Sequence, residues 1–428
     1  MKLPEKLLHF IWRYKLIDQT NLCTTQGESL RIIDFGQLNT NAGADFELAK
    51  IQIQNRIWIG NIELHVSSLD WKYHQHHLDP RYNSTILHVV WENPENIKIK
   101  RLDGTEIPTL VLKDYINQSL LEKYHHLMMN EQWIACENQL HKVTQFTISN
   151  WLDRLIIERL ESKMVMVNSC AKVTNYDWQK VQLIALARAF GMKVNNEVFE
   201  KLMTQMKINL FYKYADDPLK LEALLFGCAG FLTGKNYQED YFTELKEEYE
   251  YLNHLHCFRG LSSIEWKFLR MRPYNFPTFR LAQFGGLLNK RVQWFEFVQV
   301  VSLEALKEDL NGIQTSAYWK DHFHFHKLSK DHNTTLTRDF IDHIILNAFV
   351  PVLFSYGRYV GNQDLQQKAL DWLQVLPVEK NTIVKSYQTQ GICAKTAGES
   401  QALIHLYKQY CTAKRCLDCA IGYALLSR

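Results

Sequence analysis

Residues 46–66 alternate between apolar and polar side chains with the period of a β-strand. The apolar positions are, in order, Ile51, Ile53, Ile57, Ile59, Ile62, Leu64 and Val66. A period of two is typical of strands that bury one face and leave the other more polar. The pattern predicts two antiparallel strands joined by a tight turn centred near Asn55.

The whole chain divides into a β-rich part and a helical part. Short segments rich in β-branched and aromatic residues predict strands near 30–36, 45–54, 56–66, 84–92, 97–101 and 106–112. Apolar spacings of three and four predict helices over 1–16, 113–130, 146–165, 177–191, 216–232, 336–354, 361–374 and 398–412. We therefore expect an α+β protein, with a β-rich domain over residues 1–125 and a larger, mostly α-helical domain over 126–428.

The predicted hairpin brings acidic and imidazole side chains together. If the pairing is symmetric about residue 55, Asp45 lies opposite His65, and Glu63 shares a strand face with His65. Carboxylates favour a divalent cation such as Mg²⁺ or Mn²⁺, and the imidazole shifts the preference towards softer metals. The alternative is a polar strand face that simply meets water.

These same residues resemble the core motif of the PD-(D/E)XK nuclease superfamily. Gly43-Ala44-Asp45-Phe46 is similar to its first acidic element, and Glu63-Leu64-His65 to its acid-x-lysine triplet. Ala44 stands where the superfamily often has proline, and His65 stands where it usually has lysine. The resemblance covers residues 28–92 and implies a nuclease-like domain in which Asp45 and Glu63 hold a catalytic metal. His65 would then act as a base or as a metal ligand.

A histidine-rich segment, residues 67–83, follows the second strand. It holds His74, His76 and His77, and its Pro, Asn and Ser residues predict a loop. His74, His76 and His77, together with Asp79, are candidate metal ligands. His88 is a further candidate, and it needs a polar partner because it lies in an apolar strand. Ordinary loop polarity is the alternative for His74 and is favoured for His77.

Lys72 and Arg81 lie in the same segment and are candidate substrate-binding residues. In a nuclease, they would face the phosphates of a nucleic acid.

Cysteines gather near the C-terminal end. Cys411, Cys416 and Cys419 form a Cys-x4-Cys-x2-Cys run, and Cys393 precedes them. Four thiolates would hold zinc or an iron–sulfur cluster, with Cys393 or Cys23 as the fourth ligand. Reduced thiols that pack a terminal helix and a redox-active CxxC pair are the alternatives.

A second polar motif lies between helical segments. Arg272, Asn275 and Arg280 surround two prolines, and a helix can restart after Pro277. These side chains could bind an anion at the start of that helix. A structural role, in which they satisfy buried carbonyl groups, is favoured.

Composition narrows the function classes only slightly. The chain has 428 residues, of which 46% are hydrophobic and 22% charged, with a net charge of +3. This balance excludes a strongly basic nucleic-acid-binding arm but leaves room for a local basic groove.

The nine cysteines, an odd number, and the absence of an export-type N-terminal pattern predict a cytoplasmic protein without a disulfide framework. The most apolar stretch, 344–356, is too short to span a bilayer, so we expect no membrane partner.

Nearly the full chain resembles a bacterial family described only as a domain of unknown function. The matching residues are Gly43–Phe46, Trp58–His65, Asp70-Trp71, His74, His76, Asp79, Tyr82, Leu87–Val90, Arg272-Pro273, Asn275–Pro277, Arg280–Gln283 and the C-terminal cysteine segment. This resemblance implies no particular activity.

Three functions remain in view. The first is a metal-dependent nuclease acting on DNA or RNA. The second is a non-catalytic nucleic-acid-binding or scaffold protein with a degenerate nuclease-like fold, favoured by His65 in the lysine position. The third is a metal-dependent hydrolase of a small substrate that uses the cluster from His74 to His88.

Overall fold

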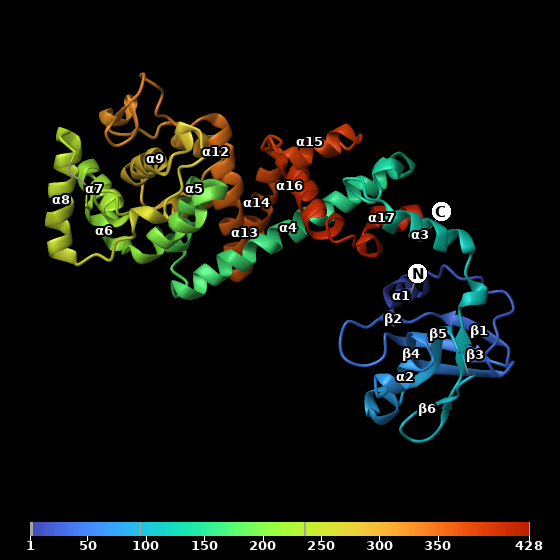
Figure 1. Ribbon diagram of the computed structural model, residues 1–428. Helices are drawn as coiled ribbons and strands as arrows, with labels where there is room; N and C mark the ends of the chain where they lie inside the picture. The colour runs from blue at the N-terminus through green and yellow to red at the C-terminus, as the bar shows by residue number, and fades with distance from the viewer. Residues whose placement is uncertain (1–2, 95, 235–236, 428) are drawn as a thin grey trace. The chain divides into compact units, whose positions relative to one another are not determined.

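The chain folds as an α+β protein, with a sheet near the N-terminus and a larger helical part after it (Figure 1). This arrangement of sheet and helices confirms the expected fold class. The computed structural model describes residues 3–94, 96–234 and 237–427.

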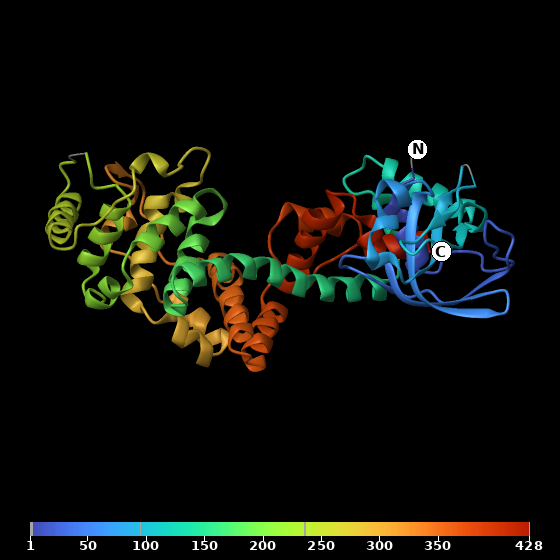
Figure 2. The ribbon, with the colours of Figure 1, turned by 90° about the horizontal axis from the view of Figure 1, so that it is seen from below.

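Two compact units make up the chain. The first unit comprises residues 1–151 and 406–428, and the second comprises residues 152–405. The expected domain boundary after residue 125 lies inside the first unit, within helix α3 (Gln118–Met129). Both ends of the chain belong to the first unit (Figure 2).

A mixed sheet forms the centre of the first unit. Its strand order is β1-β3-β4-β5-β8, and β2 pairs with β3 at one side. The pairs β1/β3 and β3/β4 are antiparallel, while β4/β5 and β5/β8 are parallel. The strands are β1 (Leu30–Asp34), β2 (Gln37–Leu38), β3 (Phe46–Ile53), β4 (Arg56–Ser67), β5 (Thr85–Glu92) and β8 (Thr109–Val111), with β6 (Ile99–Lys100) and β7 (Glu106–Ile107) in a separate small sheet.

The β3–β4 pairing differs from the expected register. Ile53 pairs with Arg56, so the turn consists of Gln54 and Asn55, with Gln54 in the left-handed region at φ 51°. A bulge between Phe46 and Ala49 shifts the register again. Because Phe46 then pairs with Ile62, Asp45 lies beside Glu63. The prediction that Asp45 faces His65 is wrong.

Helices and short turns complete the first unit. Helix α1 packs on β4, and its buried Leu8 and Ile11 join a core with Leu64 of β4. The C-terminal segment reaches the same core, since the Tyr423 ring lies 4.2 Å from that of Tyr14. The helices are α1 (Glu5–Arg13), α2 (Asp70–Tyr73), α3 and α17 (Ala420–Leu426); the 3-10 turns are η1 (His76–Leu78), η2 (Pro80–Tyr82), η3 (Lys113–Tyr115), η4 (Glu137–Lys142) and η10 (Cys416–Asp418), with the π-helix η9 (Leu406–Cys411).

The second unit is almost entirely helical. Helix α4 (Gln145–Val173) begins in the first unit and continues into the second as one helix (Figure 2). The other elements are α5 (Trp178–Gln205), α6 (Ile208–Lys213), α7 (Pro218–Cys228), α8 (Asp240–His256), η5 (Ser263–Glu265), η6 (Pro273–Asn275), α9 (Pro277–Lys290), α10 (Trp294–Val300), α11 (Leu303–Asn311), η7 (Ala317–Lys320), β9 (His322–His324), β10 (Lys327–Leu328), α12 (Arg338–Ile344), η8 (Ile345–Phe349), α13 (Val350–Tyr359), α14 (Gln363–Val375), α15 (Thr382–Thr389) and α16 (Ala397–His405).

The most apolar helical run is longer than the sequence pattern predicted. Elements α12, η8 and α13 form one run, Arg338–Tyr359, that is long and apolar enough to cross a bilayer by length and composition. Of its most apolar window, 78% is buried within the protein. A core helix of this kind passes the same test, so the run is weak evidence for a membrane span.

Candidate functional site

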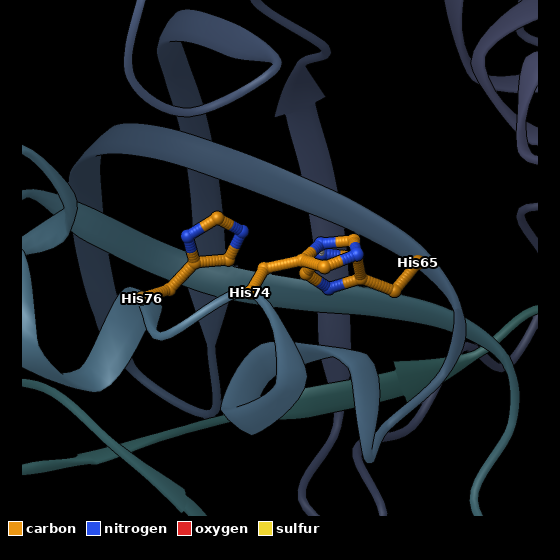
Figure 3. Close-up of side chains that lie close together, drawn as sticks. All are labelled: His65, His74 and His76. Atoms are coloured by element: carbon orange, nitrogen blue, oxygen red, sulfur yellow. Dashed lines mark hydrogen bonds between the residues drawn. The ribbon is translucent and has the colours of Figure 1, made fainter.

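Three imidazoles gather on one side of β4. His65 lies on β4, and His74 and His76 come from the segment that follows it (Figure 3). One nitrogen from each ring can be chosen so that all three lie within 4.8 Å of one another. Gln75 adopts a left-handed conformation at φ 60° between the two loop histidines. This turn of the backbone lets His74 and His76 both approach His65.

The ring nitrogens form a chain of contacts. His65 Nε2 lies 3.1 Å from His74 Nδ1, and His65 Nδ1 lies 2.8 Å from His88 Nε2. His65 is therefore the polar partner of His88 at Nε2, while the buried Nδ1 of His88 has no hydrogen-bond partner among the described residues. Because each imidazole contacts another imidazole, the tautomers of the cluster are linked.

Two carboxylates adjoin the imidazoles. Glu63 Oε1 lies 3.2 Å from His76 Nε2 and 3.5 Å from His65 Nε2. The other oxygen of Glu63 accepts a hydrogen bond from the Asp45 backbone N–H, and Asp45 Oδ2 accepts one from the Leu64 N–H. Each acid is thus fixed by the neighbouring strand, which orients both carboxyl groups.

Helix α1 adds two side chains, His9 and Glu5, to this cluster. His9 Nε2 lies 3.2 Å from Asp45 Oδ2 and 3.9 Å from Glu5. Burial alone would lower the pKa of His9, but the hydrogen bond and charge of Asp45, together with the charge of Glu5, raise it above its ordinary value. The cationic form of His9 is therefore favoured beside Asp45.

Burial changes the protonation of the central groups in opposite directions. Burial, followed by the charge of Asp45, raises the pKa of Glu63 to about 8. Burial, followed by the nearby His76 and His74, lowers the pKa of His65 to about 3, and burial also lowers the pKa of His76 and His88. The imidazoles of His65, His76 and His88 are therefore neutral near pH 7, and the neutral imidazole is the form that ligates a metal.

Aromatic side chains enclose part of the cluster. The Tyr82 ring stacks on His76 with 3.8 Å between ring centroids. Trp71 lies edge-on to both His76 and His88 and donates its indole N–H to the Lys100 carbonyl. His74 remains exposed, so the site is open to solvent on that side.

Most of the residues expected at the acidic site are placed together. Asp45, Glu63, His65, His76 and His88 all belong to the cluster described above. Lys72 is exposed on α2, and Arg81 is exposed but pairs with the Asp79 carboxylate. Of the two candidate substrate-binding cations, Lys72 and Arg81, only Lys72 has no recorded ion pair among the described residues.

Sequence reasoning left one contribution open and missed another. His74 was a candidate ligand with ordinary loop polarity as its alternative, and its position depends on the left-handed turn at Gln75, which nothing in the residue types requires. His9 and Glu5 were not singled out, although they lie four residues apart, as neighbours on one helix face do. That spacing was the available signal, but it does not show that the face meets Asp45.

The candidate cysteine ligands belong to both units of the chain. Cys393 is exposed and belongs to the second unit, whereas Cys411, Cys416 and Cys419 belong to the first. In the first unit, Cys136 accompanies these three. Burial, followed by the charges of Cys411, Cys419 and Cys416, raises the pKa of the Cys136 thiol.

Other contacts hold the two cysteine-bearing segments together. The Trp133 ring stacks on Tyr407 at 5.0 Å, and Lys414 Nζ donates to the Met128 carbonyl. Among the described residues, the three imidazoles are the group of three or more possible ligands whose atoms all lie within 4.8 Å of one another, and no three of the four sulfurs meet this criterion.

Comparisons with known proteins identify a family without extending the chemistry. Neither the curated proteins nor the solved structures contain a match. A family model described as "Protein of unknown function (DUF2851)" matches residues 5–382, which is most of the chain and includes every residue of the imidazole and carboxylate cluster. The chain therefore belongs to this family, as the resemblance over its full length indicated.

Proposed function

We propose that the protein is a metal-dependent hydrolase that cleaves phosphodiester bonds in DNA or RNA. The observation that carries the proposal is the convergence of His65, His74 and His76, with their ligand atoms within 4.8 Å. Three imidazoles beside a carboxylate form a donor set that suits Zn²⁺ or Mn²⁺ better than Mg²⁺. A bound cation of this kind lowers the pKa of a coordinated water and offsets charge on a phosphate.

The remaining groups have distinct roles in this proposal. Glu63 contacts two of the imidazoles, so its carboxylate would complete the ligand set or accept a proton from water. The Asp45 carboxylate lies against His9 and accepts a hydrogen bond from the Leu64 N–H on the strand that carries Glu63. His65 stands in the lysine position of the PD-(D/E)XK pattern, and its lowered pKa makes it a neutral ligand where lysine would supply a positive charge.

A nuclease screen tests this proposal. The purified protein is incubated with single- and double-stranded DNA and RNA in the presence of Mn²⁺, Zn²⁺, Co²⁺ or Mg²⁺. We expect cleavage that falls by about 100-fold or more in Asp45→Asn and His76→Ala, because metal sites respond strongly to their ligands and outer-shell partners. His77→Ala, which alters the adjacent histidine outside the trio, should cleave normally.

The screen also separates the two alternatives. A protein that binds nucleic acid without cleaving it, under every metal condition, would fit the scaffold function and contradict the proposal. Hydrolysis of nucleotides or small phosphodiesters without polymer cleavage would indicate the small-substrate hydrolase. One observation favours that alternative, since the side chain of Arg81, a candidate phosphate contact, pairs with Asp79.

A second metal centre is proposed at the cysteines. Cys136, Cys411, Cys416 and Cys419 together provide four thiols from two segments of the first unit. We propose that they hold a thiophilic centre, either zinc or an iron–sulfur cluster. A visible absorption band that disappears in Cys136→Ser would mark iron–sulfur, and a colourless protein with bound zinc would mark zinc. Retention of all bound metal in Cys136→Ser would contradict this assignment.

A further inference from the structure

A buried arginine in the second unit has no acidic partner. Arg280 lies in the first turn of α9 and is only 8% exposed. No ion pair is recorded for it in the described part of the chain, and burial lowers its pKa to about 9, with no neighbouring acid contributing. Since a guanidinium stays charged in proteins, this is a desolvated positive charge without a counter-charge.

Neutral groups hold the guanidinium in place. One Nη donates to Asn275 Oδ1 at 2.8 Å, and the other donates to Gln283 Oε1 at 2.7 Å. The guanidinium carbon lies 3.5 Å from the centre of the Phe340 ring, so one face of the group is stacked. The buried Nε–H has no hydrogen-bond partner. The group is therefore oriented and still has donors to offer.

The arginine lines a pocket of about 520 Å³. This volume is within the range of small-molecule sites. Arg272 and Tyr274 lie on its wall together with apolar residues that include Leu346 and Leu376. The pocket thus combines apolar and cationic side chains, which can orient an organic anion, with three carboxylates.

The acidic residues on the wall already have partners. Asp339 pairs with Lys380 at 2.6 Å, and Asp342 pairs with Lys307 at 2.8 Å. Glu379 accepts a hydrogen bond from the Gln401 side chain. None of these carboxylates has a recorded contact with Arg280, so their charges do not replace the missing counter-charge.

The pocket wall also contains a break in a helix. Met192 has φ 52° and ψ −144°, a non-helical conformation in the middle of α5. A non-glycine residue in this region costs about 1–3 kcal/mol and is often found at binding sites. The break places Met192 on the pocket wall.

We propose that this pocket binds a small organic anion, with its carboxylate or phosphate oxygens against Arg280 and its apolar portion against the helical wall. Arginine offers five N–H groups, of which two are used by Asn275 and Gln283. The remaining donors match the paired oxygens of a carboxylate or phosphate. This site lies entirely within residues 152–405 and is independent of the imidazole cluster.

Calorimetric titration of the full chain tests the proposal. The probes are citrate, malate, inorganic phosphate and adenosine monophosphate, at constant ionic strength. We expect at least one probe to bind, and Arg280→Met to bind it about 10- to 100-fold more weakly, as for a lost charged hydrogen bond. The carboxylate and phosphate probes distinguish the two oxygen sources.

Two further variants keep the test informative. Arg272→Gln changes an exposed residue of the wall and should weaken binding about threefold to tenfold without affecting folding. Arg259→Gln removes an exposed arginine that does not line the pocket and should bind as the unmodified chain does. Absence of binding for every probe, or equal affinity in Arg272→Gln and Arg280→Met, would overturn the proposal.

Discussion

The candidate metal site depends mainly on individual buried side chains. The apolar strand around His88 predicted that this imidazole needs a partner, and His65 is that partner. Residue type and alternation were sufficient to place Glu63 and His65 together, because both lie on the continuous strand β4. They were insufficient for His74, whose position depends on the backbone conformation of Gln75.

Burial also perturbs a carboxyl group far from the imidazole cluster. Burial raises the pKa of Glu222 to about 7, although hydrogen bonds with Tyr241 and Ser316 partly offset it. The folded protein therefore retains this proton at pH values where the unfolded chain, with an ordinary value of 4.5, has lost it. Stability from this group is fully present below pH 4.5 and is lost as the pH rises towards 7.

The corresponding test is the pH dependence of urea unfolding. Between pH 5 and 8, the chain should lose on the order of 3 kcal/mol of unfolding free energy that Glu222→Gln does not lose. Glu247→Gln changes an exposed acid on α8 and should keep the original pH dependence. An unchanged pH dependence in Glu222→Gln would show that the buried carboxyl is not responsible.

At the scale of elements, alternation predicted the strands but not their register. The side chains of 46–66 indicate which positions are buried, whereas the position of the turn and the bulge near Leu48 depend on backbone geometry. Leu48 adopts φ 57° at the bulge, and its apolar side chain is exposed. An apolar residue in the sequence does not indicate such a conformation, so the bulge could not be predicted. A shift of two positions in the partner of Asp45 followed from these local features.

Gly60 controls how closely β4 and β5 approach. A Cβ at this position would lie 2.4 Å from the Ser84 carbonyl oxygen and 2.5 Å from Ile86 Cγ2. We expect Gly60→Ala to destabilise the first unit by about 1–3 kcal/mol, since backbone must move to admit the methyl group. Gly260→Ala, where the nearest atom is 3.4 Å away, should cost much less. Equal unfolding midpoints for the two variants would contradict this account of the packing.

For the whole molecule, the sequence indicated a β-rich part followed by helices, but not the return of the C-terminus. Segment 406–428 belongs to the first unit, and its Tyr423 packs against Phe10 and Tyr14. Contacts between residues so far apart in the chain leave no local pattern. The cysteine run was visible in the sequence, yet Cys136 could be added only when the fold brought the two segments together.

Removal of residues 406–428 should therefore affect the two units unequally. We expect hydrogen exchange in α1 and α3 to become faster, because their core loses Cys416 and Leu426. Exchange in α5 and α9 of the second unit should remain unchanged. Similar acceleration in both units would argue against the division into a first and a second unit.

The central claim is that His65, His74 and His76 form a metal site, and titration of metal-stripped protein with Ni²⁺ tests it most directly. Ni²⁺ is well suited to imidazole ligands and is not among the metals that thiolates select, so it discriminates against the cysteines. We expect one equivalent to bind, with affinity about 100-fold lower in His74→Ala and His76→Ala and unchanged in His77→Ala. Absence of binding, or equal affinity in all four proteins, would contradict the claim.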